Sequence, residues 1–205
     1  MLLWGARGTG KSSLVKALLD EYAEQGLRLI EVDKHDLLDL PEIVEPLYER
    51  PERFLLYCDD LSFEADDPSY KALKAMLDGS ISTAPDNVLL CATSNRRHLL
   101  PEYMRDNQEA RIVEGELHHG EAVEEKISLS ERFGLWLSFH PFSQEDYLAI
   151  VGHWMGQLEL SEGLGEAARA EALRWALQRG SRSGRVAWQF ARDWVGRRRV
   201  QGHHG

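Results

Sequence analysis

The sequence predicts an α/β fold, in which a parallel sheet of five strands is flanked by helices and followed by three further helices. Up to residue 141, short apolar segments alternate with segments of helical periodicity, and parallel strands need crossover connections of this kind. Beyond Pro141 only helical patterns remain. We therefore expect an α/β core at residues 1–141 and a helical lid with a short tail at residues 142–205.

The predicted strands are short apolar segments bounded by glycine, proline or charged residues. The third of them is apolar throughout, which is typical of a central strand covered on both faces. The five segments are residues 2–4, 27–32, 54–58, 87–92 and 135–139.

The predicted helices have apolar residues three and four positions apart. Gly26 is expected to end the first helix, because glycine readily adopts positive φ. Ser143 and Asp146 form a capping-box pattern where the C-terminal helices begin. The polar stretch at residues 96–120 is expected to be a long loop or insertion. The predicted helical ranges are residues 11–25, 41–48, 70–77, 122–129, 143–158, 166–178 and 185–197.

Composition excludes some classes of function. The 205 residues carry 34 acidic and 24 basic side chains, and a net charge of −10 argues against coating nucleic acid through bulk charge. No apolar segment is long enough to cross a membrane, and the N-terminus has no secretory pattern. Cys58 and Cys91 lie in apolar segments, as core thiols of a reduced compartment do. We expect a cytoplasmic protein without membrane contact.

The charge is unevenly distributed along the chain. Residues 166–205 contain nine arginines and three acidic residues, about +6, which leaves about −16 on residues 1–165. One interpretation is a basic helical cap packed beside an acidic body. The other is a basic surface that meets an anion such as ATP or a nucleic acid.

Residues 5–12, with the sequence GARGTGKS, match the P-loop pattern between a predicted strand and a predicted helix. Glycines let backbone N–H groups turn toward phosphate oxygens, and the following helix offers its positive N-terminus. We expect Lys11 to reach the β- and γ-phosphates of ATP and Ser12 to ligate Mg²⁺. The predicted nucleotide-binding residues are Gly5, Ala6, Arg7, Gly8, Thr9, Gly10, Lys11, Ser12 and Ser13.

Polar residues follow two further predicted strands. Asp59 is expected to hold Mg²⁺, and Asp60 to polarise the attacking water, a role in which glutamate is more usual. Glu64 is an alternative to Asp60. Asn95 follows the fourth strand and is expected to orient the water or contact the γ-phosphate.

These motifs, taken in order, resemble those of AAA+ ATPases, with Asn95 as the sensor-1 residue. Residues 130–134, SERFG, look like the arginine-finger box, which implies that Arg132 acts on the ATP of a neighbouring subunit. Arg96 and Arg97 are alternative fingers.

The resemblance also covers the last predicted helix. Residues 183–185, SGR, are similar to the sensor-2 motif, which implies that Arg185 reaches the γ-phosphate from the lid. The paired acids resemble those of bacterial initiator and helicase-loader ATPases.

More closely, three segments look like an uncharacterised bacterial AAA+ family, domain of unknown function 815. They are residues 58–64 (CDDLSFE), 92–98 (ATSNRRH) and 132–136 (RFGLW). The resemblance extends from residue 2 to about residue 197. Members usually carry a further N-terminal segment, so we expect one to be missing here and adenine discrimination to be weak.

The resemblance implies an ATPase that works as a homo-oligomer, a ring or partial ring, and couples hydrolysis to remodelling of a protein or DNA partner. One alternative is a nucleotide-gated binding module with little or no hydrolysis, which would be DNA-associated and similar to the loaders. A P-loop kinase acting on small molecules is a third class.

Overall fold

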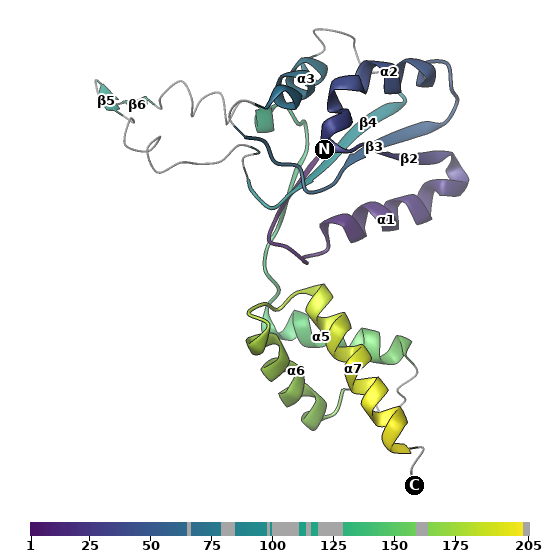
Figure 1. Ribbon diagram of the computed structural model, residues 1–205, viewed down its shortest axis with the longest axis vertical. Coiled ribbons are helices and arrows are strands. Elements are labelled where there is room, and N and C mark those ends of the chain that lie inside the picture. The colour runs from purple at the N-terminus through teal and green to yellow at the C-terminus, as the bar shows by residue number, and fades with distance from the viewer. Residues whose placement is uncertain are drawn as a thin grey trace. The chain divides into compact units, whose positions relative to one another are not determined.

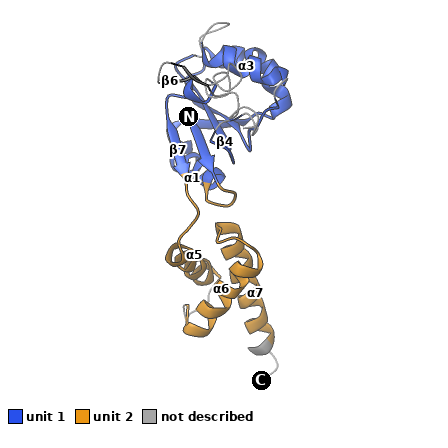
Figure 2. Ribbon diagram, turned by 90° about the vertical axis from the view of Figure 1, so that its left-hand side faces the viewer, with its two compact units in different colours: residues 1–5, 11–138 blue, residues 6–10, 139–205 orange. Residues whose placement is uncertain are grey.

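The computed structural model describes residues 1–64, 67–78, 85–97, 99, 111–113, 116–118, 129–158 and 164–202. It divides into two compact units (Figure 2). The sheet unit comprises Met1–Gly5 and Lys11–Ser138, and the helical unit comprises Ala6–Gly10 and Phe139–Gly205. The central residues of the P-loop therefore pack with the C-terminal helices, although they connect two elements of the sheet unit.

The sheet unit contains the predicted five-stranded parallel sheet, with the strand order β2-β3-β4-β1-β7. Helix α1 covers one face of this sheet, and α2 and α3 cover the other (Figure 1). The bounds of the strands are β1 Leu2–Gly5, β2 Leu27–Glu31, β3 Arg53–Cys58, β4 Val88–Ser94 and β7 Trp136–Phe139.

The central strands are buried and pair in a defined parallel register. In β3 every residue from Phe54 to Cys58 is buried. Cys58 pairs with Ala92 of β4, which in turn pairs with Leu2 of β1. Because parallel strands end at the same edge, the residues after β1, β3 and β4 are brought together.

Helices of the sheet unit begin and end where local chemistry requires. Helix α1 spans Lys11–Tyr22 and continues as a 3₁₀ turn to Gly26, whose φ of 92° ends it as predicted. Helix α3 spans Pro68–Leu77, and the Asp67 side chain caps it by accepting from the Ser69 N–H.

The helix predicted at residues 41–48 is only partly correct. Helix α2 spans Leu40–Val44, and a 3₁₀ turn follows at Glu45–Leu47. Pro46 explains the change, because it has no N–H to continue the α-helical hydrogen bonds. A further 3₁₀ segment at Lys34–Asp39 lies in a region without a predicted element.

The loop predicted at residues 96–120 contains a short antiparallel pair. Strand β5 spans Arg111–Val113 and pairs with β6, Glu116–His118. Strands of three residues are too short for alternation to be visible in the sequence, which is why this pair was not predicted. Apart from Leu129, the helix predicted at residues 122–129 lies outside the described residues.

The helical unit contains α5 Gln144–Gln157, α6 Glu166–Gln178 and α7 Gly184–Gly202 (Figure 1). The capping box between Ser143 and Asp146 is present at the start of α5. Tyr147, Ala172 and Phe190, one from each helix, are fully buried in a common core. Within the described part of the chain, no helix combines the length and apolar composition needed to cross a bilayer.

Candidate functional site: a phosphate loop and a polar sheet edge

The P-loop connects the end of β1 to the start of α1. Gly5, Gly8 and Gly10 all have positive φ, and the Thr9 hydroxyl donates to the Ala6 carbonyl at 2.8 Å. Gly8 also needs its missing side chain for space, because a Cβ there would lie 2.6 Å from the Cβ of Ser183. Loop shape and close packing therefore both depend on the glycines of the motif.

Lys11, the first residue of α1, is only 7% exposed. Its ammonium donates to the Gly5 carbonyl at 2.7 Å and to Asn95 Oδ1 at 3.2 Å. Lys11 therefore links the loop to the end of β4. Ser12 is half-buried beside it, while Ser13 is exposed.

Asp59 follows β3 and accepts three hydroxyl hydrogen bonds on a single oxygen, Oδ1. The donors are Ser12 at 3.0 Å, Tyr57 at 2.6 Å and Thr93 at 2.6 Å. Burial works to raise the pKa of Asp59, but these hydrogen bonds outweigh it and hold the pKa below its usual range. The carboxylate is therefore ionised and fixed in place at neutral pH.

Asp60 is the only described non-glycine residue with positive φ, at 50°. Its backbone N–H donates to the Thr93 hydroxyl at 2.8 Å, and its carboxylate accepts from the Asn95 amide. An unfavourable backbone conformation held by such contacts is typical of functional sites. The predicted pair of Asp60 and Asn95 is thus in direct contact. Glu64, the alternative to Asp60, has an exposed side chain.

Tyr57 and Thr93 are site residues that sequence reasoning missed. One signal is present in the sequence: Tyr57 precedes Asp59 by two positions, so the two side chains leave β3 on the same face. Thr93 follows the register pair of Cys58 with Ala92, which places it opposite Asp59. Only the strand pairing, which the sequence does not show, reveals this convergence.

The candidate finger residues have different surroundings. Arg132 is half-buried and forms an ion pair with Asp78, at the end of α3. Arg96 is exposed, and Arg97 lies over the Trp4 ring, 5.8 Å from its centroid. Phe133, next to Arg132, is buried in the core of the sheet unit, so the backbone beside Arg132 is well anchored.

The sensor-2-like residues lie in the helical unit. Ser183 is buried, and the Gly184 N–H donates to the Gly8 carbonyl at 2.8 Å. Arg185 is exposed in the first turn of α7. The P-loop and the start of α7 are therefore in direct contact, one residue away from Arg185.

A cavity of about 640 Å³ lies beside the P-loop in the helical unit. Its walls include Ala6 and Thr9 of the loop, Phe142, and Leu173 and Leu177 of α6. Leu177 is 81% exposed, an unusual state for a leucine. The volume falls in the range of small-molecule sites, and apolar side chains make up much of the lining.

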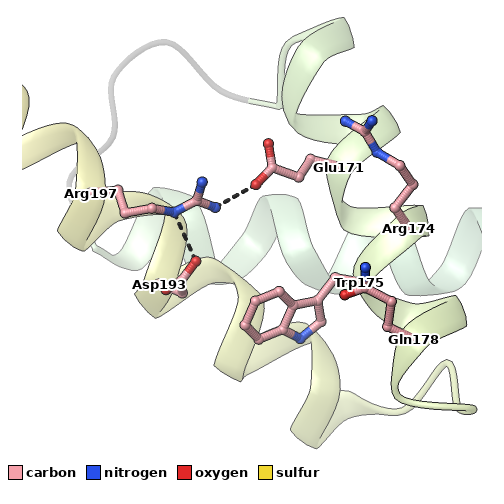
Figure 3. A pocket seen from close by; sticks show the side chains of 6 residues that line it. All are labelled: Glu171, Arg174, Trp175, Gln178, Asp193 and Arg197. Atoms are coloured by element: carbon pink, nitrogen blue, oxygen red, sulfur yellow. Dashed lines mark hydrogen bonds and ion pairs between the residues drawn. The ribbon is translucent and has the colours of Figure 1, made fainter.

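A second cavity, of about 490 Å³, lies between α6 and α7 (Figure 3). Arg197 donates there to Glu171 at 2.5 Å and to Asp193 at 2.9 Å, while Arg174 also lines the wall. Two cations and two carboxylates balance, so this cavity has no preference for an anion. We interpret it as an ion-pair network that joins the two helices.

The arginines at residues 197–199 are largely engaged within the helical unit. Arg199 donates to the Leu158 carbonyl at 2.9 Å, just beyond the end of α5, and Arg198 lies over the Trp194 ring. Cations are favourable at helix C-termini, which explains the first contact. These contacts fit the interpretation of a basic cap better than that of a free anionic-partner surface.

Cys58 and Cys91 are buried in neighbouring strands as free thiols. Burial raises the pKa of Cys58 to about 12 and that of Cys91 to about 11. Thiols held neutral in this way are poor nucleophiles, as expected of core residues.

Together, the parallel sheet, the P-loop after β1 and the acids after β3 define the class: the fold is that of the AAA+ P-loop ATPases. Among solved structures, a point variant of Thermotoga maritima RuvB matches with a TM-score of 0.56 and 17% identity, over 93% of this chain and 52% of that one. Another T. maritima RuvB, described as a Holliday junction branch migration motor, gives 0.54 and 18% over the same shares.

The chain thus spans about half the length of these RuvB chains, and at such identity the likeness establishes the fold alone. No curated protein matches the sequence. The family is identified by a match over residues 1–198. The chain belongs to the family described as protein of unknown function (DUF815).

Proposed function

We propose that this protein is an ATP-binding AAA+ ATPase that couples hydrolysis to the remodelling of a partner. The observation that carries the proposal is the convergence of five polar residues at one sheet edge. Lys11 contacts Asn95, Asn95 contacts Asp60, and Ser12 contacts Asp59, all by direct hydrogen bonds. A strand-to-helix turn with no ligand would have no need of this arrangement.

The residues at this edge fit Mg²⁺. The Ser12 hydroxyl and the Asp59 carboxylate lie 3.0 Å apart, and both are hard oxygen donors. Magnesium is usually held by one or two carboxylates together with water and substrate phosphates. When bound, the ion would neutralise charge on the phosphates. Ser12 and Asp59 would hold it, and Lys11 would bind the phosphate oxygens.

Asp60 and Asn95 would hold the attacking water in place. Their contact fixes both side chains, so little reorganisation would be needed for the reaction. Arg132 from a neighbouring subunit would stabilise the transition-state charge, and Arg185 would contact the γ-phosphate. Measured arginine fingers raise turnover by about 10³–10⁵. This assignment requires a homo-oligomer.

The cavity beside the P-loop would take the base. Its walls are mainly apolar, as for Phe142 and Leu177, and apolar contact discriminates poorly between purines. We therefore expect the affinities for ATP and GTP to agree within about tenfold in a calorimetric titration. A strong preference for ATP would contradict this role of the cavity.

The proposal is tested with two substitutions and a matched control. Lys11→Ala should abolish nucleotide binding, whereas Lys16→Ala, which changes an exposed lysine of the same helix, should bind like the parent. Arg132→Ala should retain binding and lose turnover. Arg96→Ala and Arg97→Ala test the alternative fingers in the same assay. If Lys11→Ala hydrolyses ATP like the parent, the site is wrongly assigned.

A second candidate function is a nucleotide-gated binding module. Asp60 supports it, because its shorter side chain stands where glutamate is usual and accepts a hydrogen bond from Asn95. Turnover per subunit should rise with protein concentration if a finger acts in trans, and stay near zero for a binding module. The partner, protein or DNA, can be sought by capture with Asp60→Asn in the presence of ATP.

A further inference from the structure

The hydroxyl groups around Asp59 carry an inference beyond the motif residues. Tyr57, Thr93 and Ser12 come from β3, β4 and α1, yet all three donate to the same carboxylate oxygen, Oδ1. A carboxylate can accept about four hydrogen bonds, so three donors from three different elements on one oxygen fix the orientation of the group.

The hydroxyls of Tyr57 and Thr93, unlike that of Ser12, have no direct role in the proposed reaction. Ser12 is the predicted Mg²⁺ ligand, so its oxygen would turn toward the ion. Tyr57 is 5% exposed and Thr93 is 1% exposed, so water cannot easily replace either donor. They would be the hydroxyls that continue to hold Asp59 once Ser12 binds the metal.

Thr93 also shapes the turn that follows β3. Its hydroxyl, while donating to Asp59, accepts from the Asp60 N–H at 2.8 Å. Its backbone carbonyl accepts from the Leu61 N–H at 2.7 Å. One residue of β4 thereby fixes both acids, which is a positioning role and not simple packing.

We propose that Tyr57 and Thr93 are positioning residues of the Mg²⁺ site, which hold the Asp59 carboxylate in the orientation that the ion requires. This inference rests on the proposed function, because it assumes that Asp59 serves Mg²⁺. Partners that orient metal ligands typically contribute roughly 10- to 100-fold to metal affinity, and we expect a contribution of that order here.

The test measures Mg²⁺ dependence without turnover. ADP binding is titrated calorimetrically in EDTA and at increasing Mg²⁺, for the parent and for Tyr57→Phe and Thr93→Val. Each variant should require about 10–100 times more Mg²⁺ for half of its effect. In EDTA, the ADP affinity should equal that of the parent, because Lys11 and the backbone of residues 5–10, which would bind the phosphates, are unchanged.

Matched variants separate positioning from packing. Thr93→Ser keeps the hydroxyl but loses a methyl group, so it should behave like the parent, and Thr93→Val should not. Tyr147→Phe removes a buried tyrosine hydroxyl that donates to the Ala172 carbonyl in the helical unit, and it should leave the Mg²⁺ response unchanged. Tyr57→Phe removes one oxygen only, so it carries the test if Thr93→Val does not fold.

The outcomes distinguish the inference from the proposed function. If the parent responds to Mg²⁺ and both Tyr57→Phe and Thr93→Val need the same Mg²⁺ concentration as the parent, the inference is overturned and the ATPase proposal stands. Equal weakening by Thr93→Ser and Thr93→Val would also overturn it, because packing would then explain the effect. If the parent binds no ADP, or binds it without regard to Mg²⁺, the proposed function fails and the inference with it.

Discussion

The two units use their charged side chains in different ways. At the carboxyl edge of the sheet, Asp59 is surrounded by three hydroxyl donors, and Asp60 meets an amide. In the helical unit, Arg197 is neutralised by Glu171 and Asp193, and Arg199 is held by a backbone carbonyl. The helical unit carries far more positive charge, yet these arginines already have partners within the unit.

Charge density is therefore a poor guide to the position of the candidate nucleotide site. The nine arginines among residues 166–205 are compatible, from the sequence alone, with either a packed basic cap or a surface for an anion. The contacts at residues 197–199 indicate helix-to-helix attachment, whereas the sheet edge, with few charges, concentrates donors and acceptors on a small number of atoms. Convergence of polar groups in a fixed geometry is what catalysis requires.

The largest predicted effect is the loss of ATP turnover on changing Asp60, at the sheet edge. Asp60→Asn should lower steady-state ATP turnover at least about 100-fold, because a carboxylate that polarises water typically contributes that much. Nucleotide affinity should change little, since Lys11 and the P-loop are untouched. The measurement is phosphate release at saturating MgATP.

Arg197→Ala is the corresponding change in the helical unit. It removes a charged side chain whose partners are Glu171 and Asp193, so turnover should stay within about twofold of the parent, as expected for an exposed ion pair. A loss comparable to that of Asp60→Asn would show that the helical arginines serve the reaction and are not only structural.

A medium effect concerns the P-loop residues that pack in the helical unit. Gly8→Ala should lower the free energy of unfolding, because φ is 76° and the new Cβ would lie 2.6 Å from that of Ser183. Gly180→Ala is a matched control, with φ 66° and nothing within 4 Å of the new Cβ. The difference between them should be about 1–3 kcal/mol, the usual cost of overpacking.

Urea unfolding of the nucleotide-free protein, followed by tryptophan fluorescence, measures both variants. Both carry the cost of a left-handed conformation, roughly 1–2 kcal/mol, so it cancels in the comparison. Equal losses for Gly8→Ala and Gly180→Ala would mean that the loop does not rest against Ser183 in solution.

The fold was predictable where patterns are strong and local. Five apolar segments indicated the five strands, and the 3.6-residue periodicity placed α6 at its observed bounds. Prediction failed where one residue altered the hydrogen bonding, as Pro46 does after α2, or where an element was too short for a pattern, as β5 and β6 are. Such details depend on tertiary contacts that periodicity does not encode.

The candidate site shows the same limit more sharply. Motif spacing predicted Lys11, Asp59 and Asn95, because those residues occupy fixed positions relative to strand ends. Tyr57 and Thr93 belong to no motif, and only the pairing of β3 with β4 brings their hydroxyls to Asp59. Residues that position others are identified by contacts, and therefore need the structure.

The smallest predicted effect compares an acid at a helix N-terminus in each unit. Burial works to raise the pKa of Asp67, but the hydrogen bond and charge of Lys34 and the Ser69 N–H hold it below its usual range. Asp146, by contrast, owes its lowered pKa to hydrogen bonds from Ser143 alone. Since both pKa values are lowered on folding, both acids stabilise the protein above the ordinary aspartate pKa of about 3.9.

Asp67→Asn keeps an oxygen for the Ser69 N–H and loses only the charge facing Lys34, 2.5 Å away. At pH 7 and low salt it should lower the free energy of unfolding by about 1 kcal/mol, the upper end for a partly exposed pair. The difference in free energy of unfolding from the parent should vanish as the pH falls through the folded pKa of Asp67, because the parent carboxylate then becomes protonated and loses its charge.

Salt should reduce the effect of Asp67→Asn at pH 7, because screening weakens the attraction between Asp67 and Lys34. The effect of Asp146→Asn should depend little on salt. Urea unfolding at several pH values and salt concentrations measures both variants. Equal salt dependence would contradict the assignment of an ion pair to Asp67 and of hydrogen bonds alone to Asp146.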